Sequence, residues 1–162
     1  MIIGKQKLLE VFPDFKGDIQ ENGIDLRVGE VYQPENHNWV GCINDEKYLP
    51  SLKRIRPEDD EYKLAPHTHY IIRVDRRIHI PDGYCQLYYI RSTFARCGLL
   101  LSAAVGDNGY DGVLELNIYN SNNDTVRIGV NERLVQAVTI CNDGTCDEYD
   151  GTYQNDKHMI WR

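Results

Sequence analysis

Residues 106–112, GDNGYDG, combine an acid, a tight turn and a tyrosine, which are residue types that a water-activating site requires. Asp107 stands just before the turn residues Asn108 and Gly109, and Tyr110 follows them. A carboxylate held at such a turn can orient and deprotonate a water molecule. The same residues also suit an ordinary hairpin turn, because Asp and Asn side chains bond to the local backbone. Taken alone, the segment favours the simple turn.

Residues 91–98, RSTFARCG, place two arginines around two hydroxyl side chains. Two guanidinium groups and two hydroxyls can together grip phosphate oxygens through charge-assisted hydrogen bonds. The four residues are Arg91, Ser92, Thr93 and Arg96. The alternative is a solvent-exposed helical turn that Ser92 caps.

Two polar residues interrupt apolar strand patterns. Asp25 lies within NGIDLRVGE, where it could support a metal-bound water or pair with an arginine such as Arg27. Gln136 alternates with Leu134 and Val138 in NERLVQAVTI. A buried amide must be hydrogen-bonded, so Gln136 belongs to a functional site, to a satisfied core or to a subunit interface.

The other reactive side chains give weaker evidence for a functional site. His67 and His69 can share a strand face, but no third ligand follows at a convincing spacing, so a metal site is disfavoured. Cys97 follows Arg96, but no histidine stands where it could act as its base. A buried thiol is the better interpretation of Cys97.

The elements that must position these residues are mostly strands. Apolar residues before Pro13 predict a short N-terminal helix that stops there. Several short segments with strand character follow, separated by Gly, Pro, Asn and Asp, and they indicate an all-β barrel or sandwich. In one of them Leu114, Leu116 and Ile118 share a face. The charged segment 44–63 is interpreted as a surface loop or excursion.

The bulk numbers exclude several classes of protein. The 162 residues suit one domain, and a formal charge of −7 argues against a nucleic acid polymer as partner. No apolar run reaches membrane-spanning length and no signal-peptide pattern is visible, so we expect no membrane association. Five scattered cysteines without a CxxC pair indicate a reducing, cytoplasmic location and no structural zinc.

Four segments in this order resemble the motifs of the trimeric dUTPase and dCTP deaminase superfamily: GIDL at 23–26, RST at 91–93, VGDNGYDG at 105–112 and ERLVQAV at 132–138. The ending YDGTYQ resembles the tail of the archaeal dUTPase branch. The resemblance implies one distorted jelly-roll β-barrel domain over residues 1–162, assembled as a homotrimer with active sites between subunits. It also implies a deoxynucleoside triphosphate substrate with Mg²⁺. Residues 145–162 would form a C-terminal tail that closes over the site.

One position separates the two activities of the superfamily. The deaminases carry a proton-shuttling glutamate ten residues after the aspartate of the third motif, and counting from Asp107 gives Asn117. An amide cannot serve as a general acid or base near neutral pH. Glu115 is on the same strand face but is displaced by about 6.6 Å at the usual strand rise. We therefore expect dUTP hydrolysis to dUMP and pyrophosphate, without deamination.

The resemblance assigns a role to each candidate residue. Asp107 would activate the attacking water, Tyr110 would cover the deoxyribose, and Gln136 would contact a phosphate or a Mg²⁺-bound water. The phosphates would be held by Arg91, Ser92, Thr93 and Arg96. The uracil edge would be read near Ala104, Val105, Gly106 and Asn117. The nucleotide would be covered by Tyr149, Tyr153 and Gln154, and Asp25 would support the site from behind.

Two alternatives stay open. A dCTP deaminase, alone or with hydrolysis, is opposed by the absence of a glutamate at 117. A non-catalytic dUTP-binding relative is opposed by the presence of Asp107 together with Tyr110 and Gln136. Two departures from the family pattern are Gly106, where an aliphatic residue is usual, and the absence of the Gly-rich fifth motif.

Overall fold

The computed structural model describes residues 1–35 and 40–156. Its N-terminal helix, α1, spans Lys5–Val11 and is followed by a 3₁₀ turn over Pro13–Phe15. The predicted helix and its end before Pro13 are confirmed. Proline has no backbone N–H and its ring blocks the preceding turn, so the α-helix cannot continue through it. Within the described residues, no helix is long and apolar enough to cross a membrane.

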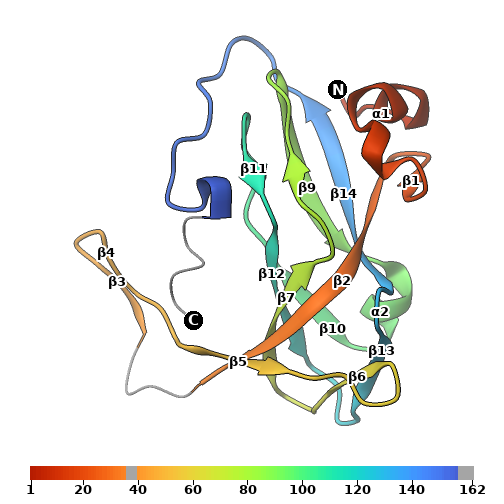
Figure 1. The fold of residues 1–162 in the computed structure, drawn as a ribbon, viewed down its shortest axis with the longest axis vertical. Coiled ribbons are helices and arrows are strands. Elements are labelled where there is room, and N and C mark those ends of the chain that lie inside the picture. The colour runs from red at the N-terminus through yellow and green to blue at the C-terminus, as the bar shows by residue number, and fades with distance from the viewer. Residues whose placement is uncertain (36–39, 157–162) are drawn as a thin grey trace.

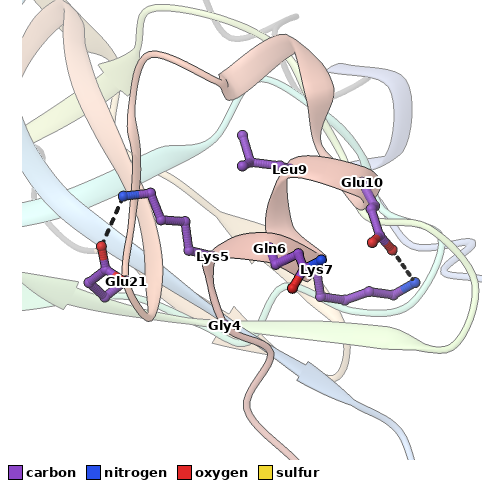
Figure 2. Close-up of a pocket in the computed structure, with 7 residues that line it drawn as sticks. All are labelled: Gly4, Lys5, Gln6, Lys7, Leu9, Glu10 and Glu21. Carbon is purple, nitrogen blue, oxygen red and sulfur yellow. Dashed lines mark hydrogen bonds and ion pairs between the residues drawn. The ribbon is translucent and has the colours of Figure 1, made fainter.

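A shallow pocket surrounds the first turn of α1 (Figure 2). Its two lysines are both paired with acids: Lys5 Nζ lies 2.9 Å from Glu21 Oε1, and Lys7 Nζ lies 2.9 Å from Glu10 Oε2. All four side chains are at least half exposed, so these pairs contribute little to stability.

One antiparallel sheet forms most of the molecule (Figure 1). In spatial order its strands are β10 (Leu99–Ser102), β12 (Glu115–Asn120), β7 (His69–Val74), β2 (Gly23–Pro34), β14 (Arg133–Cys141) and β9 (Tyr84–Ile90). The short strands β1 (Ile19–Gln20) and β5 (Leu52–Ile55) also pair with β2. The two ends of the sheet, β10 and β9, lie close together, which gives a nearly closed barrel. The predicted all-β barrel is confirmed.

Strand β2 closes the barrel by changing partners along its length. Its first half pairs with β14, and its second half pairs with β7 and β5. The register with β7 shifts between Val28 and Glu30, at Gly29. A Cβ at Gly29 would lie 2.8 Å from the carbonyl oxygen of Val74, so only glycine allows the two backbones to approach this closely. The bulge bends the strand, so that its first half can pair with β14 and its second half with β7 and β5.

The core follows the alternation expected from the sequence. Leu116 and Ile118 of β12, and Leu114 just before it, are all buried, as predicted for one face of this segment. Two further pairs of strands form separate two-stranded sheets: β8 (Ile78–His79) with β11 (Asp111–Gly112), and β6 (Glu61–Leu64) with β13 (Val126–Gly129).

The charged segment 44–63 is an exposed excursion, but its interpretation as a loop was wrong. It contributes to the hairpin of β3 (Gly41–Ile43) and β4 (Glu46–Tyr48), and it contains β5 and most of β6. The hairpin turn consists of Asn44 and Asp45, whose φ angles are 50° and 65°. Asn and Asp tolerate this left-handed conformation, which two-residue hairpin turns require. Figure 1 shows this hairpin projecting from the barrel; we call residues 40–50 the arm.

A buried amide connects three segments at one end of the barrel. Asn120 is 0% exposed, and its Nδ2 donates to the carbonyl oxygens of Leu64, Ala65 and Asp124 at 2.9 to 3.1 Å. Its Oδ1 accepts from the backbone N–H of Asn122 at 2.9 Å. The side chain therefore bonds to backbone groups at the end of β6 and in the turn that follows β12.

Replacing Asn120 by alanine should lower the free energy of unfolding by about 2–4 kcal/mol, because several buried backbone groups lose their partner. Urea denaturation followed by circular dichroism measures the change. Asn123→Ala is the matched control, since Asn123 is exposed and bonds to His67 at the surface; its change should stay within about 0.5 kcal/mol. Equal effects of the two substitutions would contradict this account of Asn120.

Candidate active site

A pocket of about 770 Å³ opens on the barrel between β7 and β12, the arm, the segment 103–107 and the C-terminal tail. Among the residues predicted for the site, the following line it: Ala104, Val105, Gly106, Asp107, Tyr110, Asn117, Tyr149 and Tyr153. The structure therefore brings together the predicted water-activating acid, the base-reading segment and two tail tyrosines. A cavity of this size suits a nucleotide-sized ligand.

Asp107 is held by its neighbours' backbone. Gly106 exchanges two backbone hydrogen bonds with Gln86, each 2.8 Å long, and the N–H of Tyr110 donates to the carbonyl of Asp107 at 3.1 Å. Gly109 takes the left-handed turn conformation, with φ of 74°. Within the described chain, no hydrogen bond or ion pair engages the Asp107 carboxylate, which is exposed to the pocket. A rigid turn thus presents an available base.

Asn108 fixes the turn to the rest of the molecule. It is 5% exposed, and its Oδ1 accepts from the N–H of Gly83 at 2.7 Å. Its Nδ2 donates to the carbonyls of Asp147 and Cys146 at 3.3 and 3.4 Å, and its own carbonyl accepts from the N–H of Tyr149 at 2.8 Å. The sequence identified Asn108 only as a turn residue, because its partners are distant in the chain.

The tail, residues 145–156 in the described structure, packs against the same turn. Gln154 Oε1 accepts from the N–H of Asp111 at 2.8 Å, and its Nε2 donates to the carbonyl of Gly109 at 2.9 Å. Gln154 thus binds the back of the turn and does not line the pocket. The rings of Tyr149 and Tyr110 lie 5.9 Å apart, and burial raises the pKa of the Tyr110 phenol.

Arg77 provides a second attachment for the tail. Its Nε lies 2.6 Å from Asp111 Oδ1, its NH1 lies 2.8 Å from Asp156 Oδ2, and its NH2 donates to Asn155 Oδ1 at 2.9 Å. Asp156 Oδ1 also accepts from the N–H of Val113 at 2.7 Å. The sequence reasoning missed Arg77 and Asp156, and no local pattern marks them. The last five residues of the chain, HMIWR, lie outside the described residues.

The arm meets the tail at the mouth of the pocket. Lys47 Nζ donates to Thr152 Oγ1 at 2.6 Å and lies 5.2 Å from the centre of the Tyr153 ring. Val40 and Leu49 of the arm line the pocket. The excursion that the sequence left without a role therefore forms one wall of the candidate site.

A second group of predicted residues lies elsewhere. Gln136 Nε2 lies 3.4 Å from Asp25 Oδ1, while Arg91 Nε and Arg133 NH1 lie 3.7 and 3.9 Å from Asp25 Oδ2. Asp25 is 1% exposed, and burial raises the pKa of its carboxyl although Arg91 and Arg133 oppose this. The alternative that Asp25 pairs with an arginine is confirmed, but the partners are Arg91 and Arg133. Arg27, given as the example, binds Asp18 at 2.7 Å instead.

The predicted phosphate-binding segment extends this second group. Helix α2 spans Ser92–Arg96 and begins after Arg91, which is its N-cap. Ser92 is inside the helix and makes no capping bond, so the alternative of a Ser cap is wrong. Ser92, Thr93 and Arg96 are exposed to solvent and do not line the pocket of Asp107. The predicted residues thus form two separate groups on one chain.

Asn117 and Glu115 both line the pocket, as expected for one face of β12. Asn117 Oδ1 lies 3.1 Å from His69 Nε2 on β7. Glu115 Oε1 lies 3.5 Å from NH2 of Arg73, which is nearly buried. Both partners were missed by the sequence reasoning, although His69 was considered as a metal ligand.

Gly106 departs from the family pattern for a steric reason. A Cβ at this position would lie 2.2 Å from the hydroxyl oxygen of Tyr88 and 2.6 Å from Cδ1 of Ile80. Tyr88, on β9, thus occupies the space that a side chain at 106 would need, and it lines the pocket. Burial raises the pKa of its phenol, which stays protonated near neutral pH.

Residues 3–139 match a protein-family model described as dCTP deaminase-like. A protein of Methanothermobacter thermautotrophicus named probable deoxyuridine 5'-triphosphate nucleotidohydrolase is 41% identical over 154 residues, covering 95% of this chain and 99% of that protein. A protein of Thermococcus kodakarensis named dCTP deaminase is 33% identical over 159 residues, covering 97% and 91%.

A solved structure shares the fold. The 2'-deoxycytidine 5'-triphosphate deaminase from Agrobacterium tumefaciens is similar with a TM-score of 0.68 at 14% identity, over 87% of this chain and 48% of that one. This chain therefore spans about half the length of that protein. The likeness supports the barrel described above.

The steric account of Gly106 gives a test by coupled substitutions. Gly106→Ala should lower the free energy of unfolding by about 1–3 kcal/mol, the usual cost of overpacking. Tyr88→Phe removes the closest atom, so the double variant should recover part of the loss. A double-mutant cycle by urea denaturation measures the coupling. Gly129→Ala is the control, since a Cβ there meets no atom within 4 Å. Strictly additive effects would refute the clash with Tyr88.

Proposed function

The chain belongs to the dCTP deaminase-like family, and we propose that it hydrolyses dUTP to dUMP and pyrophosphate. The observation that carries the proposal is the pairing of Asp107 and Asn117 in one pocket. The pocket contains an available carboxylate for activating water, and it holds an amide where deamination needs a glutamate. The name of the Methanothermobacter relative, 41% identical over nearly the whole chain, supports the same reaction.

In the proposed reaction Asp107 orients a water molecule in line with the α-phosphorus and accepts its proton. The water oxygen forms a bond to phosphorus as the bond to the leaving pyrophosphate oxygen breaks. Tyr110, whose ring is fixed by Tyr149, supports the deoxyribose. The backbone at 104–106 and the Asn117 amide contact the base. Tyr149 and Tyr153 cover the nucleotide and exclude water from it.

We propose Mg²⁺ as the cofactor, bound mainly by the triphosphate and by water. The described residues contain no group of three His, Cys, Asp or Glu that could hold a metal ion. Such a group is not needed where substrate phosphates supply the ligands. Asp25 Oδ2, which has no hydrogen-bond partner in the described structure, fits an acceptor for a metal-bound water beside Gln136. The metal would neutralise charge on the leaving pyrophosphate.

We propose that the active site is completed by a second copy of the chain in a homotrimer. One chain carries the pocket, and separately carries the group of Arg91, Arg96 and Gln136 with the α2 hydroxyls. A triphosphate in the pocket needs cations that the pocket's own lining does not provide. The second group, supplied by a neighbour, would meet this need. The five free thiols suit the reducing cytoplasm, where we place the enzyme.

Asp107→Asn should reduce dUTP turnover by about 10²–10⁴-fold, the usual contribution of a general base, while dUTP binding persists. The assay incubates the protein with Mg²⁺ and either dUTP or dCTP, and separates the products by chromatography. Asp143→Asn, an exposed acid outside the pocket, is the control. Wild-type turnover in Asp107→Asn would refute its role as the base. Conversion of dCTP to dUTP or dUMP by the wild type would instead favour the deaminase and implicate Glu115.

A shared site predicts complementation between inactive variants. Asp107→Asn and Arg91→Ala should each be inactive as purified proteins. After mixing, unfolding and refolding together, mixed assemblies should regain a measurable fraction of wild-type turnover, because some sites combine an intact pocket with an intact Arg91. Refolding each variant alone is the control. No recovery, with assembly intact by light scattering, would show that both groups serve the same chain's site.

A further inference from the structure

His69 and Asn117 form a polar pair inside the pocket. They come from neighbouring strands, β7 and β12, and Asn117 Oδ1 lies 3.1 Å from His69 Nε2. In the sheet register Asn117 stands opposite Ile71 and His69 stands opposite Tyr119, so the two polar side chains meet diagonally on one face. The mechanism proposed above uses Asn117 but leaves His69 without a function.

We infer that His69 is a specificity-determining residue: it fixes the orientation of the Asn117 amide and thereby selects uracil over cytosine. This inference rests on the proposed function. When His69 Nε2–H donates to Asn117 Oδ1, the amide carbonyl is occupied. The Nδ2 amino group, which has no partner within the described residues, is then turned away from His69 and offered to a ligand.

The two pyrimidines differ at the atom that this amide can meet. Uracil carries an oxygen acceptor at ring position 4, whereas cytosine carries an amino donor there. An amide fixed with its amino group toward the base donates a hydrogen bond to the uracil oxygen. With cytosine the same amino group meets another donor, so no hydrogen bond can form. The reversed amide would have the opposite preference. The selection therefore depends on what holds the amide, and His69 is that group.

The apolar walls of the pocket strengthen the preference for uracil over cytosine. The His69–Asn117 pair is exposed in the free protein. The buried Ile71 and the half-exposed Val105 line the same pocket, so a base bound against them would cover the pair and exclude water from it. In a desolvated site an unmatched donor pair is costly, because neither group can turn to solvent. The same pair in open water would discriminate little.

The test uses substitutions with fixed hydrogen-bond character. His69→Lys supplies only donors, and His69→Glu supplies only acceptors and should turn the amide round. His67→Lys and His67→Glu are the matched controls, because His67 lies two residues away, bonds to Asn123 and is outside the pocket. Dissociation constants are measured by calorimetry for the α,β-imido analogues of dUTP and dCTP with Mg²⁺. The ratio of the two constants cancels charge effects on the common triphosphate.

The wild type and His69→Lys should both prefer the dUTP analogue. His69→Glu should shift the ratio toward the dCTP analogue by about tenfold or more, the factor expected from one matched against one mismatched hydrogen bond. The His67 variants should keep the wild-type ratio. An unchanged ratio in His69→Glu, in a protein whose wild type still hydrolyses dUTP, overturns the role of His69 and leaves the proposed function intact. A wild type that neither binds nor hydrolyses dUTP overturns both.

Discussion

The candidate site depends on the hydrogen bonds of one buried side chain, that of Asn108. One buried amide bonds to the loop before β9, to the tail and, through the adjacent backbone carbonyl, to Tyr149. Each of these contacts fixes something different: the position of Asp107, the course of the tail and the ring that packs on Tyr110. Such an amide stabilises the fold by more than the sum of its separate hydrogen bonds, because removing it leaves several buried polar groups without a partner. Asp107, the proposed base, is therefore placed by a neighbour that does not itself line the pocket.

The sequence predicted the fold well wherever the information is local. Alternation identified β12, and Pro13 marked the end of α1. The hairpin at Asn44–Asp45 was missed because each of its strands has only 3 residues and is exposed throughout, so no apolar alternation marks them. Strand β2 pairs with β14 on one side and with β7 on the other, and this depends on a bulge at Gly29. The bulge could not be predicted, because it is required only by partner strands that lie far away in the sequence.

The site was predicted in part. Resemblance identified Asp107, Tyr110 and Asn117, and the structure brings all three to one pocket. It did not identify Arg77, Tyr88 or His69, because each acts through a partner far away in the chain: Asp156, Gly106 and Asn117. Arg91 and Gln136, which the resemblance assigned to a site between subunits, form their own group around the buried Asp25. A motif records which residues a site needs, but not whether one copy of the chain supplies them all.

The attachment of the tail has an entropic consequence. Ordering a backbone residue costs roughly 1–2 kcal/mol, and a cover that is disordered without ligand must draw that cost from the ligand's binding energy. Here Asn108, Arg77 and Gln154 already hold residues 146–156 in place by contacts with the chain's own turn. If the tail covers the nucleotide as proposed above, binding would carry less of this entropic cost, and affinity would gain from preorganisation. The same contacts would slow release of the product, which would then compete with the chemical step as the rate-limiting one.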